Sequence, residues 1–202
     1  QRQLEAASPS EKPALLISLA KLAYQELDRP DDGEQFVNAA LAEQADYIPA
    51  LTLLGEQSFD SGRWAQARRA FAALEDVEGV HARPDDRYRL AVSILKTGDP
   101  DEAFERLRRL RAEGVYFVGL SLAFAEACFQ SDRKDALCIA LTSIDDASIP
   151  ERVDILRRSA RLLATDEQDR EHATELWEQV KRLADNDEEA QFALVRLADD
   201  SA

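Results

Sequence analysis

The chain has 202 residues, of which 45% are hydrophobic, and it contains seven glycines and seven prolines, a composition that excludes collagen-like and low-complexity proteins. Forty acidic residues against 25 basic ones give a net charge of -15. Such a field repels phosphate backbones and anionic lipid, so it argues against nucleic acid and bare membrane surfaces and favours a cationic partner. The alternative that stays open is that the acid excess mainly keeps the protein soluble.

The first predicted hairpin covers residues 13–47. Apolar residues recur every three or four positions over 13–27, which predicts an amphipathic helix. They are Leu15, Leu16, Leu19, Leu22 and Ala23. Proline, glycine and two aspartates at 29–33 predict a turn followed by a helix N-cap. The second helix then carries Phe36, Val37, Ala40 and Leu41.

The clearest hairpin covers residues 48–81. Pro49 marks a helix start, because its missing N–H is not needed in the first turn, and Gly62 ends that helix before Trp64. The second helix has a narrow face of small and apolar residues, along which two helices can approach closely. This face consists of Ala65, Ala67, Ala70, Phe71 and Leu74.

The third predicted hairpin covers residues 84–115 and follows a connection that we expect over 76–86. The sequence TGDP at 97–100 is a strong turn signal. Asp101 and Glu102 then favour the start of a helix, because carboxylates are stabilised at helix N-termini.

Two more hairpins and one helix complete the chain. In the hairpin at 116–149, Phe124 and Ser131 stand where the better hairpins have a small residue and a glycine. The helix at 187–199 is either half of a further hairpin or a terminal cap. The hairpin at 150–184 has a predicted buried set of Ala160, Leu163, Ala173, Trp177 and Val180.

A repeated pattern links these hairpins. The segment at 54–74, LGEQSFDSGRWAQARRAFAAL, returns at 90–110 as LAVSILKTGDPDEAFERLRRL. Recurrence at about 33 to 37 residues indicates a stacked array of helical hairpins, and no stretch of alternating polarity competes, so the predicted fold class is all-α. The matched residues, expected to pack the repeats, are Leu54, Gly55, Gly62, Ala67 and Phe71 and then Leu90, Ala91, Gly98, Ala103 and Leu107.

This spacing of small and bulky residues resembles the tetratricopeptide repeat (TPR), strongly over 48–112 and loosely elsewhere. The resemblance implies a right-handed superhelical α-solenoid of about five TPR-like hairpins plus a terminal helix, forming a single array over 1–202. It also implies a concave groove, lined by the first helix of each hairpin, that holds peptides or partner domains. It implies no catalysis.

Two first helices supply the candidate groove contacts. They are Thr52, Glu56, Phe59 and Asp60 from one helix and Tyr88, Val92, Leu95 and Lys96 from the next. Glu56 and Asp60 lie one turn apart and form an acidic stripe that would receive a lysine or arginine of a partner. Ordinary solvation of this stripe is the open alternative.

A group of arginines lies in the second helix of the third hairpin. Its members are Arg106, Arg108, Arg109 and Arg111, with Arg83, Arg87 and Arg89 shortly before. We expect this group to be exposed and paired with Glu102, Glu105 and Glu113. Phosphate binding is the alternative.

No catalytic motif is present: G-x-S-x-G, P-loop and H-E-x-x-H patterns are absent. No Cys/His spacing suits a metal either, so we expect no enzyme, no cofactor and no metal site. Carboxylate pairs at 145–146 and 199–200 are interpreted as solvated helix caps. Cys128 and Cys138 are expected in the two helices of one hairpin as buried free thiols, although a disulfide stays open.

The leading hypothesis is a non-catalytic protein-interaction scaffold within a longer protein. The chain lacks methionine, a signal peptide and any run of 18 or more apolar residues, so we expect an excerpt that does not itself insert into a membrane. Arginine and alanine bias is common in GC-rich bacteria, whose TPR arrays include periplasmic scaffold regions of exopolysaccharide exporters active in biofilms. By that analogy the chain would recruit a partner enzyme or guide a cationic polysaccharide in the periplasm, as part of a membrane-anchored protein. The alternative is a cytoplasmic regulatory or sensor domain that binds a peptide.

Overall fold

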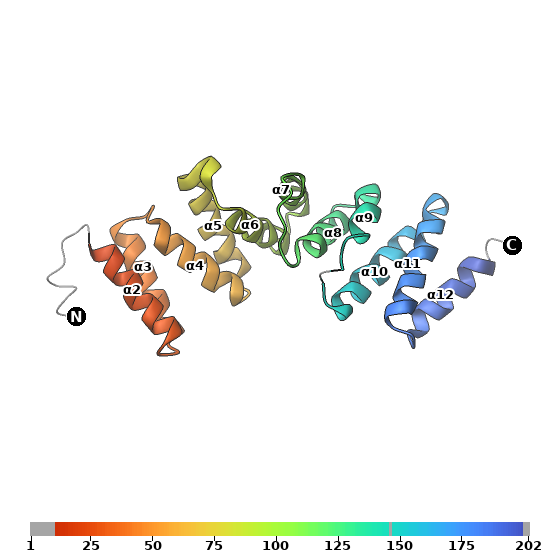
Figure 1. The fold of residues 1–202 in the computed structure, drawn as a ribbon, viewed down its shortest axis with the longest axis horizontal. Coiled ribbons are helices and arrows are strands. Elements are labelled where there is room, and N and C mark those ends of the chain that lie inside the picture. The colour runs from red at the N-terminus through yellow and green to blue at the C-terminus, as the bar shows by residue number, and fades with distance from the viewer. Residues whose placement is uncertain (1–10, 146, 200–202) are drawn as a thin grey trace. The chain divides into compact units, whose positions relative to one another are not determined.

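The computed structural model describes residues 11–145 and 147–199, and the regular structure of these residues is helical, without a strand (Figure 1). The all-α expectation is therefore confirmed. The helices are α2 (Lys12–Gln25), α3 (Pro30–Glu43), α4 (Ile48–Asp60), α5 (Trp64–Glu78), α6 (Pro84–Lys96), α7 (Pro100–Ala112), α8 (Leu120–Gln130), α9 (Lys134–Leu141), α10 (Ile149–Leu163), α11 (Arg170–Leu183) and α12 (Glu188–Asp199), with short 3₁₀ helices η1 (Gly79–His81) and η2 (Glu167–Asp169).

The chain divides into two compact units, Gln1–Asp99 (unit 1) and Pro100–Ala202 (unit 2). In unit 1, α2 packs on α3 and α4 on α5, and α3–α4 and α5–α6 contacts join successive hairpins. In unit 2, α8 packs on α9 and α10 on α11, while α7 contacts α8 and α11 contacts α12. The division falls in the turn between α6 and α7, inside the hairpin predicted at 84–115. A single array over 1–202 stays a prediction.

Three hairpin turns share one backbone geometry. Each has a residue with positive φ, namely Gly62 (69°), Gly98 (89°) and Asp132 (54°). The next residue donates its N–H to the carbonyl five positions earlier, at 2.8, 3.2 and 2.9 Å respectively, which is the Schellman ending of a helix. Asp132, and not the expected Ser131, therefore stands in the glycine position, because aspartate tolerates left-handed backbone better than most residues.

The first turn differs from its prediction. Pro30 begins α3, so residues 30–33 form the first turn of a helix and not a loop. Proline is favoured at that position for the same reason that it is favoured in turns, its fixed φ. The chain reverses at Asp28, whose φ is 49°. Gly33 lies inside the hairpin, where a Cβ would stand 2.8 Å from the ring of Tyr24.

The buried face of α2 also differs from the predicted one. Ile17 and Ala20 are buried, whereas Leu22 is exposed and α2 ends before Leu27. Apolar residues lie on more than one side of this helix, so its contacts decide which side is covered. The core cluster that selects this side comprises Leu16, Ile17, Ala20, Val37, Ala40, Ala50, Leu53, Leu54 and Ala70.

The connection expected over 76–86 is shorter than predicted. Helix α5 continues to Glu78 and α6 begins at Pro84, so only η1 and two further residues separate the helices. Asp86 lies in the first turn of α6, where it is buried and accepts two hydrogen bonds from Arg83, at 2.7 and 3.0 Å. Asp85 and Asp86 at the end of the expected connection belong to α6 because acidic residues favour the first turn of a helix.

The residues predicted to pack the repeats lie in the core. A Cβ on Gly55 would stand 2.8 Å from the ring of Phe71, so α4 and α5 approach more closely there than a larger residue allows. Gly62 and Gly98 occupy the turns described above. The buried members of the set are Leu54, Ala67, Phe71, Leu90, Ala91, Ala103 and Leu107.

The helices of unit 2 also pack through buried apolar residues. Phe124, which replaces a small residue of the better hairpins, is buried and stacks on Phe104 of α7 at a centroid distance of 5.3 Å. Helix α10 begins with a capping box between Ser148 and Glu151. All five residues predicted to be buried in the α10–α11 hairpin are buried: Ala160, Leu163, Ala173, Trp177 and Val180.

Candidate partner-binding site

The first helices of successive hairpins contact one another within each unit. In unit 1, α4 touches both α2 and α6, and in unit 2, α8 touches α10. Their exposed side is called here the first-helix face. Glu56 and Phe59 of α4, two of the predicted groove contacts, are partly accessible.

An ion-pair network joins α4 and α6 on this face. Arg89 lies 3.1 Å from Glu56 on the preceding first helix and 2.9 Å from Asp85 one turn earlier on its own helix. The predicted acidic stripe of Glu56 and Asp60 is therefore partly neutralised, because Glu56 already has a cationic partner. Asp60 is exposed.

Phe59 belongs to an aromatic cluster between α4 and α5. Its ring meets Trp64 edge-on at 5.2 Å and Phe71 at 6.5 Å between centroids. Such edge-to-face pairs hold a ring in one orientation. Phe59 is half-buried, so part of the ring stays accessible on the first-helix face.

Two of the predicted groove contacts are not at the surface. Val92 and Leu95 are buried, which corrects the expectation that a ligand would touch them. Membership of a first helix does not by itself distinguish an exposed position from a buried one. Thr52 and Tyr88 are half-buried and Lys96 is exposed.

Unit 2 carries the same residue types at the equivalent positions. Glu126 of α8 accepts two hydrogen bonds from Arg158 of α10, at 3.1 and 2.5 Å, and Asp154 lies 2.9 Å from the same arginine. The Arg158 guanidinium also lies 5.0 Å from the centre of the Phe129 ring. Hydrogen bonding to Glu126 raises the pKa of Arg158 above its ordinary value.

The sequence contained a signal for these residues that was missed. Residues 55–63, GEQSFDSGR, and 125–133, AEACFQSDR, align without a gap at a distance of two repeats. We call the two sets, Glu56/Phe59/Asp85/Arg89 and Glu126/Phe129/Asp154/Arg158, the ion-pair modules of unit 1 and unit 2.

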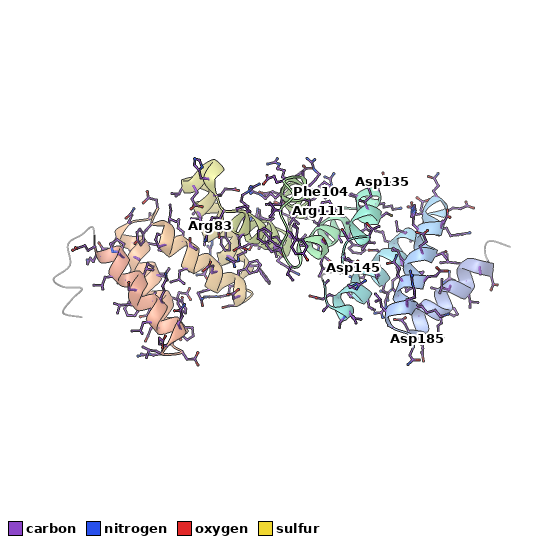
Figure 2. All side chains as sticks on the ribbon, in the orientation of Figure 1. Arg83, Phe104, Arg111, Asp135, Asp145 and Asp185 are labelled. Atoms are coloured by element: carbon purple, nitrogen blue, oxygen red, sulfur yellow. The ribbon has the colours of Figure 1, made fainter. Side chains whose placement is uncertain are left out.

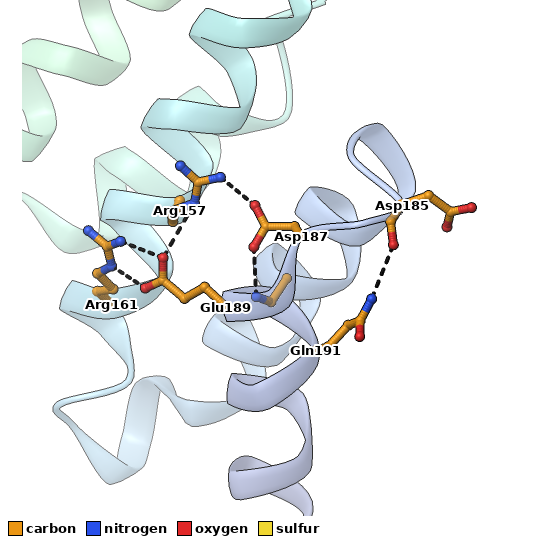
Figure 3. A network of polar contacts seen from close by, with 7 residues as sticks. Arg157, Arg161, Asp185, Asp187, Glu189 and Gln191 are labelled. Carbon is orange, nitrogen blue, oxygen red and sulfur yellow. Dashed lines mark hydrogen bonds and ion pairs between the residues drawn. The ribbon is translucent and has the colours of Figure 1, made fainter.

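A further polar network joins α10 to the start of α12 (Figure 3). Arg161 forms two hydrogen bonds with Glu189, both at 2.5 Å, and Arg157 pairs with Asp187. Asp187 in turn accepts the N–H of Ala190 at 2.8 Å, which caps α12. The bond from Arg161 holds the pKa of Glu189 below its ordinary value.

The arginine group in α7 is only partly as expected. Arg106 pairs with Glu102 at 2.9 Å and Arg108 with Glu105 at 2.7 Å, as predicted. Arg111, which Figure 2 labels, differs. Its guanidinium lies 4.4 Å from the centre of the Phe124 ring, and it donates a hydrogen bond to Ser143 at 3.3 Å. Arg111 therefore packs between hairpins of unit 2, because the aromatic face of α8 lies beside it.

The remaining predicted groups have structural surroundings. Both cysteines are free thiols; Cys128 is buried and Cys138 only half-buried, and burial raises the pKa of the Cys128 thiol to about 11. Asp145 pairs with Arg152 at 2.6 Å, whereas Asp146 and Asp200 lie outside the described residues. Within residues 11–145 and 147–199, no group of three or more His, Cys, Asp or Glu side chains could hold a metal ion. Over the same ranges no helix has the length and apolar character needed to cross a membrane.

Comparison with known proteins points to one fold. No family model and no curated protein matches the sequence. Among solved structures, YrrB, described as a TPR protein with an unusual peptide-binding site, matches with a TM-score of 0.70 and 17% identity over 88% of this chain and 89% of that chain. The C-terminal part of a TPR repeat-containing protein from Cytophaga hutchinsonii matches with a TM-score of 0.64 and 14% identity over 96% of this chain and 80% of that chain. A TPR protein from Parabacteroides merdae matches with a TM-score of 0.62 and 13% identity over 96% of this chain and 87% of that chain. The chain thus has the helical-hairpin fold of TPR proteins.

Proposed function

We propose that this protein is a non-catalytic scaffold that binds a partner protein or peptide on its first-helix face. The fold supports this function, because stacked helical hairpins present long surfaces and no reaction centre. YrrB, which shares the fold, is described as having a peptide-binding site.

The observation that carries the proposal is the repetition of the ion-pair module in both units. Each module holds two carboxylates, one arginine and one aromatic ring on adjacent first helices, with a net charge of one negative unit. Asp85 and Asp154 keep 42% and 60% of their side-chain surface exposed. A face that repeats the same accessible carboxylate beside an aromatic ring suits an extended segment with cationic and apolar side chains.

In unit 1 the proposed contacts extend beyond the module. Of the groove residues predicted from sequence, those that remain at least partly accessible are Thr52, Glu56, Phe59, Asp60, Tyr88 and Lys96. Phe59 supplies a partly accessible aromatic ring to this surface.

A peptide library displayed on phage, screened against the whole chain, tests the proposal. We expect enrichment of segments that combine Lys or Arg with apolar residues. Replacing both Asp85 and Asp154 by asparagine should weaken binding of a selected peptide about tenfold, because the free energies of two partly exposed charge contacts are lost together.

The matched control removes two exposed carboxylates elsewhere in the chain. Asp135→Asn with Asp185→Asn changes the net charge equally and should alter the affinity less than about twofold, because screening weakens distant charges. Equal losses in both double variants would show that only net charge attracts the peptide. Failure to enrich any segment would overturn the proposal.

A narrower version places this scaffold in the periplasm within an exopolysaccharide exporter, where it guides a cationic polymer or recruits an enzyme that modifies it. The net charge of -15 supports this version. Its test is a chitosan oligomer compared with the fully N-acetylated oligomer, which lacks the charge. Salt-sensitive binding of chitosan alone is expected. If both oligomers bind equally, or if neither binds, the alternative hypothesis of a cytoplasmic peptide-binding regulator is favoured.

A further inference from the structure

A hollow of about 320 Å³ lies in unit 2 between the end of α10, the start of α11 and one side of α12. Its main lining residues are Arg161, Arg170, Trp177, Phe192, Arg196 and Leu197. The Arg161–Glu189 pair of Figure 3 stands at its wall. The hollow belongs to neither ion-pair module, and no sequence motif predicts it.

The charge of this hollow is opposite to that of the whole chain. Three arginines and one glutamate line it, whereas the chain carries a net charge of -15. Glu189 has both carboxylate oxygens bonded to Arg161, so it neutralises one of the three cations. Arg196 is exposed and has no ion-pair partner among the described residues, which leaves its guanidinium available to an anion.

The rest of the lining is apolar and aromatic. Trp177 is only 2% exposed, while Phe192 is 66% exposed. Ala164 and Ala193 complete the apolar part of the lining. The exposed phenyl ring of Phe192 would gain free energy if the apolar side chain of a partner covered it.

We propose that this hollow anchors a partner segment in which a carboxylate stands next to an aromatic or branched aliphatic side chain. The carboxylate bonds to Arg196 beside Arg161, and the apolar side chain fills the space between Trp177 and Phe192. A volume near the lower end for ligand pockets fits one or two residues of a partner. This inference rests on the proposed scaffold function and adds a second, anion-selective contact to it.

Three small probes separate the two parts of this chemistry. N-acetyl-phenylalaninate carries the carboxylate and the ring, N-acetyl-phenylalaninamide carries only the ring, and N-acetylglycinate carries only the carboxylate. The chain has two tryptophans, so NMR can follow the indole N–H of Trp177 in the hollow and that of Trp64 in unit 1 as an internal reference. We expect a saturable shift of the Trp177 signal with the first probe, at least about fivefold weaker binding of the other two, and no shift of Trp64.

Two variants test the assignment of residues. Arg196→Gln should weaken N-acetyl-phenylalaninate about tenfold, the loss expected for one charge-assisted hydrogen bond, and bring it to the affinity of the amide. Phe192→Ala should weaken both aromatic probes alike. The matched control is Arg109→Gln on α7, which removes the same charge from an exposed position outside the hollow and should change nothing.

The proposal is overturned if the acid and the amide bind equally, if Arg196→Gln and Arg109→Gln have the same effect, or if Trp177 shows no saturable response. These results are distinct from a failure of the scaffold function. A basic peptide that still binds the first-helix face while the probes fail would refute the anchor alone, and a probe that binds without any peptide doing so would refute the scaffold alone.

Discussion

Unit 1 and unit 2 carry their ion-pair modules in different surroundings. In unit 2 both oxygens of Glu126 bond to Arg158, the arginine covers Phe129, and 16% of the Glu126 side chain is exposed. In unit 1 a single contact joins Arg89 to Glu56, which stays 35% exposed, and Phe59 is held by the aromatic residues of α5 instead.

The two modules therefore differ in how firmly the glutamate is held. The module of unit 2 uses its charges and its ring mainly to join α8 to α10. In unit 1 the glutamate stays more exposed, and the ring of Phe59 packs against Trp64 and Phe71 instead of against the arginine. Glu56 is therefore held less firmly than Glu126, and four predictions test this contrast between the units.

The largest effect is expected from removing the support behind Phe59. Phe71→Ala should lower the free energy of unfolding by about 3–5 kcal/mol, because a fully buried ring is lost, and should speed hydrogen exchange in α4 and α5. Leu141→Ala, at the equivalent position of unit 2, is the control. Because each repeat contacts only its neighbours, Leu141→Ala should leave hydrogen exchange in α4 unchanged. Faster exchange in α4 of this variant would show that the two units do not unfold independently.

The next effect distinguishes the two glutamates. Glu126→Gln should lower the free energy of unfolding by about 2 kcal/mol, because it breaks a bidentate, largely buried pair, whereas Glu56→Gln should change it by less than about 1 kcal/mol. Urea unfolding of both variants measures the contrast. A loss at Glu56 as large as that at Glu126 would show that both modules are structural.

A smaller effect concerns the turns that follow the modules. Gly62→Ala should destabilise by about 1 kcal/mol, because the new side chain strains a positive φ, although it meets no atom closer than 3.9 Å. Asp132→Gly should stabilise by about 0.5 kcal/mol for the same reason. Thermal unfolding checks both signs, and a stabilising Gly62→Ala would refute the shared turn geometry.

The smallest effect is a pH dependence in unit 1. Hydrogen bonds from Gln66 and Arg63 hold the pKa of Glu34 below its ordinary value of 4.5. The stability that it contributes is therefore complete above about pH 4.5 and is lost as the pH falls through the lowered pKa. Glu34→Gln should flatten the acid limb of a stability–pH curve by less than about 1 kcal/mol, while Glu43→Gln, at an exposed pair with Lys12, should preserve it.

Much of the fold followed from local sequence. The hairpins at 48–81 and 150–184 have the expected helices and buried residues, because proline, glycine and helical periodicity act over a few positions. The errors arose where local signals were ambiguous: Pro30 fitted a turn or a helix start, and the apolar residues of α2 fitted two faces.

The candidate site was less predictable. The predicted positions on α4 are at least partly accessible, whereas Val92 and Leu95 are buried, because burial depends on neighbouring helices. The equivalence of 55–63 and 125–133 was available in the sequence, whereas the pairing of Arg111 with Phe124 was not.

The sequence by itself determined an all-helical chain of hairpins, the ends of most of its helices and the residues that let paired helices approach. Tertiary structure alone decided which side of α2 is buried, which carboxylates of the first-helix face have cationic partners, and that arginines and aromatic rings surround a hollow beside α12. The physical reason is range: turn and helix preferences act between near neighbours, while these pairings join side chains about one repeat apart, whose distance only packing sets.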